Sequence, residues 1–147
     1  MSYAKGDFVD SAFPVREAPD RPEIKRLHVG YVERVAALSD GTRAAVVLYT
    51  TSVARPAGRP KRKGEVDIDE RSSRAMGMQK AFTIDVFRVM IVPINEQWFP
   101  SFGQPGFGIR GKAPENLQRH IGQMFDRAIV DQEPLLHIYP RRPKRKS

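Results

Sequence analysis

Two β-type segments joined by an Asp-Gly turn constrain this chain more than any other feature of its sequence. Residues 27–32 and 44–49 are both rich in strand-forming residues, and Asp40-Gly41 between them is a strong hairpin signal. In an antiparallel hairpin the start of the first strand lies beside the end of the second. The sequence therefore predicts that residues 25–28 and 50–52, which carry cations, an imidazole and hydroxyls, meet at one rim.

The face on which each side chain of this hairpin lies depends on its register. If the Asp-Gly dipeptide is the whole loop, Gly30 pairs with Thr51, and residues two apart on one strand share a face. This register predicts Arg26, His28 and Thr51 on one side of the sheet, with open space above Gly30. A three-residue loop with a bulge would shift the pairing by one residue and bring Thr50 to the position of Thr51.

Composition indicates one folded domain. The chain has 147 residues, of which 40% are hydrophobic, and a chain of this length can bury a proper core without disulfides. The absence of cysteine excludes disulfides and thiolate metal sites and favours a cytoplasmic location. No apolar run approaches the roughly 20 residues of a membrane helix, and residues 1–20 lack the apolar centre of a signal peptide. We therefore expect no membrane contact.

The net charge of +8 is concentrated in two Pro-containing segments, a loop at 53–64 that we expect to be mobile and a basic tail at 138–147. The ten cations of these segments are Arg55, Arg59, Lys61, Arg62, Lys63, Arg141, Arg142, Lys144, Arg145 and Lys146. Without them, 15 of the 25 basic residues remain against 17 acidic ones. Flexible basic segments on a nearly neutral body are typical of proteins that contact a polyanion, although they also serve solubility alone.

The rest of the chain predicts strands followed by one helix. Residues 82–93 form the longest β-type run, and their apolar phase changes near Val86-Phe87, which predicts a bulge or a break. Residues 114–130 repeat apolar residues every three or four positions, as in an amphipathic helix. Residues 99–112 are rich in glycine and are interpreted as a flexible connector. We expect residues 1–137 to form a single domain.

One further strand is predicted over residues 65–69, where polar and apolar residues alternate. Its three carboxylates, Glu65, Asp67 and Asp69, are compatible with a divalent cation or, more simply, with a solvated strand face, and we predict no metal site. Residues 135–139 form a last strand or dock on the surface. Among the aromatic residues, Trp98 is the first candidate for stacking on an exposed base.

Several motifs, taken in their order along the chain, resemble the MazF/PemK family of toxin endoribonucleases. They are Gly6-Asp7-Phe8-Val9 with Phe13-Pro14, Lys25-Arg26 entering a strand, Leu48-Tyr49-Thr50-Thr51-Ser52, Phe82 to Val89 with Val92-Pro93, Gly108-Ile109, and Pro114-Glu115-Asn116-Leu117. The resemblance spans about residues 6 to 130. It implies a mainly β (α+β) fold, a small SH3-like β-barrel with a C-terminal amphipathic helix.

The same resemblance implies a homodimer that cuts single-stranded RNA without metal or cofactor and is held by an acidic antitoxin-like protein. It assigns cleavage to Arg26 and Thr51. Leu27 stands where the family usually has proline, and this departure favours an alternative, a non-catalytic module that binds nucleic acid or a protein partner on the same barrel.

The residues themselves suggest how the chemistry would be divided. A guanidinium at Arg26 suits the charge that develops on the phosphate, and Thr51 would orient a phosphate oxygen or the attacking hydroxyl. His28 lies two positions from Arg26, and histidine titrates in the range where a general acid or base works. A half-exposed strand histidine bound to water is the simpler alternative. Lys25 is expected to bind phosphate.

Overall fold

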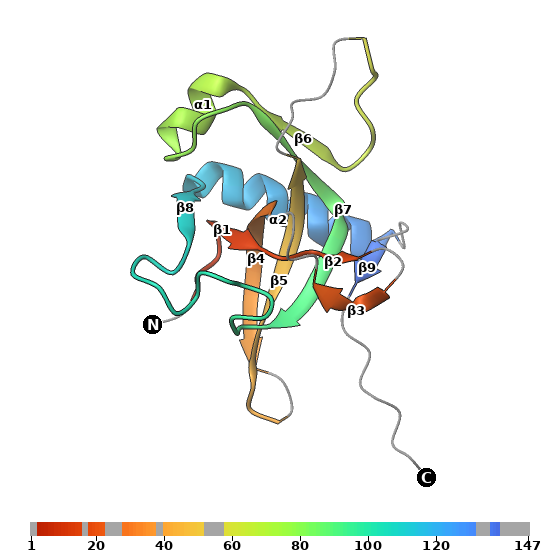
Figure 1. Ribbon diagram of the computed structural model, residues 1–147. Helices are drawn as coiled ribbons and strands as arrows, with labels where there is room; N and C mark the ends of the chain where they lie inside the picture. Colours follow the sequence, from red (N-terminus) through yellow and green to blue (C-terminus); the bar gives the residue numbers. More distant parts are fainter. Residues whose placement is uncertain are drawn as a thin grey trace.

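Strands dominate the computed structural model of this chain, which describes residues 3–15, 18–22, 28–37, 40–51, 58–131 and 136–138. The elements in chain order are β1 Asp7–Ser11, β2 Pro14–Val15, β3 Ala18–Pro22, β4 His28–Ala37, β5 Arg43–Thr51, β6 Glu65–Ile68, α1 Glu70–Ala75, β7 Phe82–Pro93, β8 Ile109–Lys112, α2 Glu115–Val130 and β9 Leu136–Ile138. A mainly β fold with a C-terminal helix is thereby confirmed (Figure 1).

One antiparallel sheet with the strand order β6-β7-β5-β4-β1-β8 organises the molecule, and β9 adds to β7 in parallel. In the described part of the chain the two edge strands, β6 and β8, do not pair with each other. The sheet is therefore not a closed barrel. The segment after α1 reaches across to β8, where the Lys112 N–H donates to the Met76 carbonyl oxygen at 3.0 Å.

The hairpin of β4 and β5 exists, but its register differs from the predicted one. β4 ends at Ala37 and β5 begins at Arg43, and these two residues pair one position away from the predicted register. A bulge at Glu33 shifts the pairing by one further residue. Beyond the bulge Gly30 pairs with Tyr49. The predicted two-residue loop and the pairing of Gly30 with Thr51 are therefore wrong, because loop and bulge each shift the register by one residue.

The predicted change of phase in the longest strand is confirmed. Leu48 of β5 pairs with Val89 of β7, whereas the next residue, Tyr49, pairs with Asp85. Residues 86–88 thus bulge out of the ladder between β5 and β7. The bulge lets Val86 and Val89 point into the same hydrophobic cluster although they are three residues apart.

Two hydrophobic clusters cover the two faces of the sheet. On one face, Ile121 and Phe125 of α2 pack on a cluster that includes Phe8 and Leu48, as expected for the predicted amphipathic helix. On the other face, residues 94–109 fold back over the sheet and bury aromatic side chains against it.

One segment that was expected to be a flexible connector contains a strand. The glycine-rich segment 99–112 packs on the sheet and ends in β8, so that prediction is wrong. Residues 18–22 form β3, which pairs with β2. Among the described residues, neither helix has the length and apolar character needed to cross a bilayer.

Candidate functional site

Polar residues occupy one end of a sheet face across four neighbouring strands, and the cluster beneath residues 94–109 occupies the rest of that face. Tyr49 pairs with Asp85, which pairs with Glu65, and in the next row Thr51 pairs with Thr83, which pairs with Asp67. Paired residues share a face, as do residues two apart on one strand. His28 belongs to the same face through Gly30, the partner of Tyr49. We call this surface the polar face; its residues are His28, Tyr49, Thr51, Glu65, Asp67, Thr83 and Asp85.

Aromatic rings and a guanidinium gather around Tyr49 on this face. The Arg88 guanidinium carbon lies 3.8 Å from the centroid of the Tyr49 ring and 6.0 Å from that of Phe13. The His28 and Tyr49 ring centroids are 4.9 Å apart. Arg88 is one of the residues in the β7 bulge, and its buried Nε has no hydrogen-bond partner among the described residues. This half-buried cation is thus held by ring contacts, and its charge acts on Asp85, where it lowers the pKa against the larger effect of burial.

Asp85 is the carboxyl group at the centre of the polar face. Its Oδ1 accepts a hydrogen bond from the backbone N–H of Phe87 at 3.0 Å, and the bulge of β7 makes this contact geometrically available. Burial is the main cause that raises the pKa of Asp85, Glu65 raises it further, and the bond from Phe87 opposes the shift. A carboxyl whose pKa is raised in this way accepts a proton more readily than an ordinary aspartate.

The two threonines on the polar face are tied into the sheet. The Thr51 hydroxyl accepts from the Thr83 backbone N–H at 3.3 Å and donates to the Thr83 carbonyl oxygen at 3.5 Å. The Thr83 hydroxyl in turn donates to Asp67 Oδ1 at 2.9 Å. These contacts fix the row in one arrangement, so Thr51 presents its hydroxyl from a rigid position.

Glu65 is held by an arginine that sequence reasoning assigned to RNA. Arg59 donates to both Glu65 carboxylate oxygens, at 3.1 and 2.8 Å, and the Arg62 backbone N–H donates to Oε1 at 2.7 Å. The hydrogen bond from Arg59 is the main cause of a lowered pKa at Glu65. Arg59 therefore anchors residues 58–64 to β6, and its guanidinium is engaged within the protein.

No protein-family model matches this sequence, and no curated protein matches it either. Any function has to be argued from the geometry of the polar face.

His28 and Thr51 lie on one face, as predicted, although the register behind that prediction is wrong. The two one-residue shifts add up to two, and a shift of two keeps every side chain on its original face. The open space predicted above Gly30 is absent. A Cβ atom there would lie 2.4 Å from Val47 Cγ1 and 2.8 Å from Ser11 Oγ.

The other predicted site residues have three different outcomes. Arg26, Lys25 and Arg55 fall outside the described residues, as does the predicted basic tail beyond Ile138. The side chains of Lys61, Arg62 and Lys63 are exposed, as a contact with RNA requires. Trp98 is only 2% exposed and lies within the cluster beneath residues 94–109. Its ring offers no surface to a base, which contradicts the predicted stacking role.

The carboxylates of residues 65–69 have structural partners instead of a common cation. Asp69 accepts from the Ser72 backbone N–H at 2.7 Å and caps α1, while Glu65 and Asp67 are bonded to Arg59 and Thr83. Within the described ranges no group of three His, Asp or Glu residues is placed to hold a metal ion.

Asp85 and Arg88 are the residues that the sequence analysis did not select. Both interrupt the apolar run of residues 82–93, and a charged residue within an apolar strand is the signal that could have found them. Their position opposite Tyr49 depends on the pairing of β5 with β7, which joins segments far apart in the chain.

Proposed function

We propose that this protein is a toxin-like endoribonuclease that cleaves single-stranded RNA on the polar face. The supporting observation is the grouping of an imidazole, a carboxyl of raised pKa and a guanidinium around the Tyr49 ring. These three groups match the needs of RNA cleavage by its own 2′-hydroxyl. A base takes the proton of that hydroxyl, a cation stabilises the phosphorane, and an acid protonates the leaving 5′-oxygen.

The roles follow from the chemistry of each group. Asp85 accepts the 2′-hydroxyl proton, and Arg88 offers planar donors to the phosphate oxygens. His28, two strands away from Asp85 and on the other side of Tyr49, gives a proton to the 5′-oxygen. The products are a 2′,3′-cyclic phosphate and a 5′-hydroxyl, so one proton is taken up and one released. Thr51 orients a phosphate oxygen by turning its hydroxyl proton to the substrate from the Thr83 carbonyl oxygen, which is 3.5 Å away. Arg26 remains a predicted second cation.

The surroundings of the polar face suit a polyanion. Lys61, Arg62 and Lys63 are exposed on the segment that Arg59 ties to β6, and the whole chain carries a net charge of +8. Such cations supply sequence-independent contacts with phosphates. A cytoplasmic homodimer controlled by an acidic antitoxin-like protein belongs to the same proposal through the family resemblance.

Cleavage of a long single-stranded RNA in EDTA tests the proposal. We expect Asp85→Asn to lower the rate by about 10²- to 10⁴-fold, as for loss of a general base, and Arg88→Met by about 10²- to 10³-fold, as for loss of charge stabilisation. Thr51→Ala and Arg26→Ala should also lower it. Glu115→Gln, which changes an exposed carboxylate in the first turn of α2, is the control and should cut normally.

A substrate with 2′-O-methyl groups should resist the enzyme completely, because the nucleophile is blocked. If this substrate is cut, or if Asp85→Asn and Arg88→Met cut as fast as the parent protein, the proposed chemistry is wrong. The alternative, a non-catalytic nucleic-acid-binding module, predicts salt-sensitive RNA binding without cleavage, and Leu27 is the sequence feature that favours it.

A further inference from the structure

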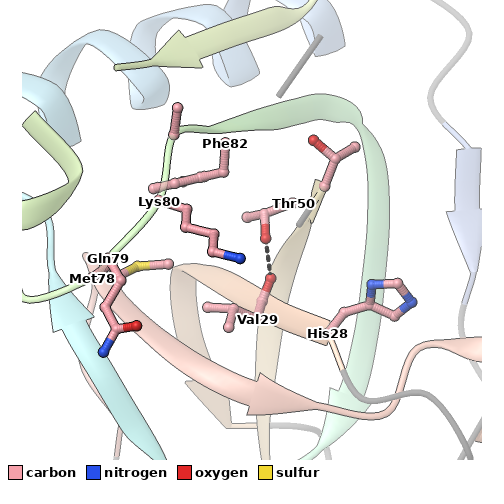
Figure 2. A pocket seen from close by; sticks show the side chains of 9 residues that line it. His28, Val29, Thr50, Met78, Gln79, Lys80 and Phe82 are labelled. Atoms are coloured by element: carbon pink, nitrogen blue, oxygen red, sulfur yellow. Dashed lines mark hydrogen bonds between the residues drawn. The ribbon is translucent and has the colours of Figure 1, made fainter. Parts of the chain in front are cut away.

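A pocket of about 240 Å³ opens at the ends of β4 and β5, on the face opposite to the polar face. Val29 and Thr50 form one wall, and the segment that leads from α1 to β7 forms the other (Figure 2). Pockets for drug-sized ligands measure about 300 to 1,000 Å³. This smaller pocket suits one planar group of one or two fused rings.

The walls of this pocket are held in place by hydrogen bonds. The hydroxyl of Ser73, which is fully buried, donates to the Lys80 carbonyl oxygen at 2.7 Å, and the Met78 backbone N–H donates to the Ser73 carbonyl oxygen at 3.0 Å. On the opposite wall the Thr50 hydroxyl donates to the Val29 carbonyl oxygen. The cavity is therefore preformed, which lowers the cost of ordering a ligand in it.

Its lining combines apolar surfaces with the Lys80 cation and the Thr50 hydroxyl, and it also includes the polar side chains of His28, Thr51 and Gln79. Val29, Met78 and Phe82 supply apolar contacts. The ammonium group of Lys80 points between these walls toward Thr50 (Figure 2). Because the Thr50 hydroxyl proton is committed to the Val29 carbonyl, its oxygen is left as an acceptor. The pocket thus offers a donor beside an acceptor to a flat ring.

We propose that this pocket is a nucleobase subsite that selects the keto-imino edge of uracil or guanine. The keto oxygen accepts from Lys80, and the adjacent ring N–H donates to the Thr50 oxygen. Cytosine and adenine present the reverse pattern, with an amino group facing the ammonium and an unprotonated ring nitrogen facing the acceptor. Unpaired polar groups of this kind are what make a site reject a wrong ligand.

The subsite rests on the proposed function, which it deepens by naming the base that is recognised. His28 and Thr51 line the pocket and also belong to the polar face, because β4 begins and β5 ends at these residues. A nucleotide crossing this end of the sheet can place its base in the pocket and its phosphate on the polar face.

Binding of short labelled oligonucleotides to the Asp85→Asn protein, followed by fluorescence anisotropy, tests the selection. Matched strands differ at one position, uridine against cytidine and inosine, which has the same edge as guanine, against adenosine. We expect the keto base to bind about tenfold more tightly, as for one hydrogen bond to a charged group. Lys80→Met and Thr50→Val should abolish the difference, whereas Lys63→Met should weaken all strands equally. Equal binding of all strands overturns the subsite.

Free nucleosides separate failure of the subsite from failure of the proposed function. The Met78 methyl group, labelled with carbon-13 and assigned through Met78→Leu, reports occupancy of the pocket by NMR. We expect uridine or guanosine to shift this resonance and cytidine to leave it in place, even if the protein cuts no RNA. If no nucleoside shifts it at millimolar concentration, or if cytidine and uridine shift it equally, the subsite is wrong while RNA cleavage can stand.

Discussion

Glu33 carries the most unusual carboxyl group at the scale of single residues. Its side chain is 2% exposed at the bulge of β4, and its Oε1 lies 3.6 Å from the Lys5 Nζ. The other oxygen, Oε2, has no hydrogen-bond partner among the described residues. Gly122 of α2 lies beside the pair, where a Cβ would be in ordinary van der Waals contact with Oε1 at 3.5 Å. Burial raises the pKa of Glu33 above its ordinary 4.5, and the charge and hydrogen bond of Lys5 oppose the shift.

This raised pKa makes stability depend on pH in a defined direction. Between 4.5 and the raised value the folded protein holds a proton that the unfolded chain has lost, so the free energy of unfolding falls as pH rises. We expect Glu33→Gln to flatten that fall. Part of the fall in stability should remain in this variant, because the pKa of Asp85 is also raised. Urea unfolding at a series of pH values, followed by the fluorescence of the single buried Trp98, measures the effect.

Glu115→Gln changes an exposed carboxylate and serves as the control for this experiment. The account is contradicted if Glu33→Gln and the parent protein lose stability with the same slope. Two further groups act on Glu33: Asp126 raises its pKa and Arg34 lowers it. The pKa of the buried Tyr31 is raised mainly by burial and further by the charge of Glu33.

At the scale of elements, α1 depends on the capping residue that precedes it. The helix has only six residues, and the Asp69 carboxylate caps it by accepting from the Ser72 N–H. We expect Asp69→Ala to lower the free energy of unfolding, because the Ser72 N–H loses its acceptor. Asp69→Asn keeps an acceptor and should cost much less. Urea titration of both variants measures this, and equal losses would mean that the cap is not the stabilising contact.

The elements also separate what the sequence could predict from what it could not. The amphipathic helix and the bulge of β7 were predictable because each follows from the spacing of apolar residues within one segment. The register of the hairpin was not, because the bulge at Glu33 is fixed by contacts with Lys5 and α2, far away in the chain. The same limit applies to the candidate site. The shared face of His28 and Thr51 could be predicted from the hairpin alone, whereas Asp85 and Arg88 lie beside Tyr49 only because β5 pairs with β7.

For the whole molecule, the uneven charge predicts how RNA binding responds to salt. The tail cations Arg141, Arg142, Lys144, Arg145 and Lys146 lie outside the described residues. We expect their joint replacement by glutamine to weaken binding to all sequences alike. Each phosphate contact that is lost should reduce the slope of log affinity against log salt by about 0.7. Anisotropy titrations over a range of salt concentrations measure the slope, and an unchanged slope would show that the tail contacts no phosphate.

The pairing of β1 with β8 has a consequence for how the chain reaches this fold. Asp10 and Arg110 form a bidentate ion pair across this junction although they are 100 positions apart. The hairpin of β4 and β5 can form soon after it leaves the ribosome, because its two strands are neighbours in sequence. One edge of β1 stays unpaired until β8 has been synthesised. Folding therefore finishes late in translation, and the exposed edge of β1 is the place where a nascent chain is most open to pairing with another.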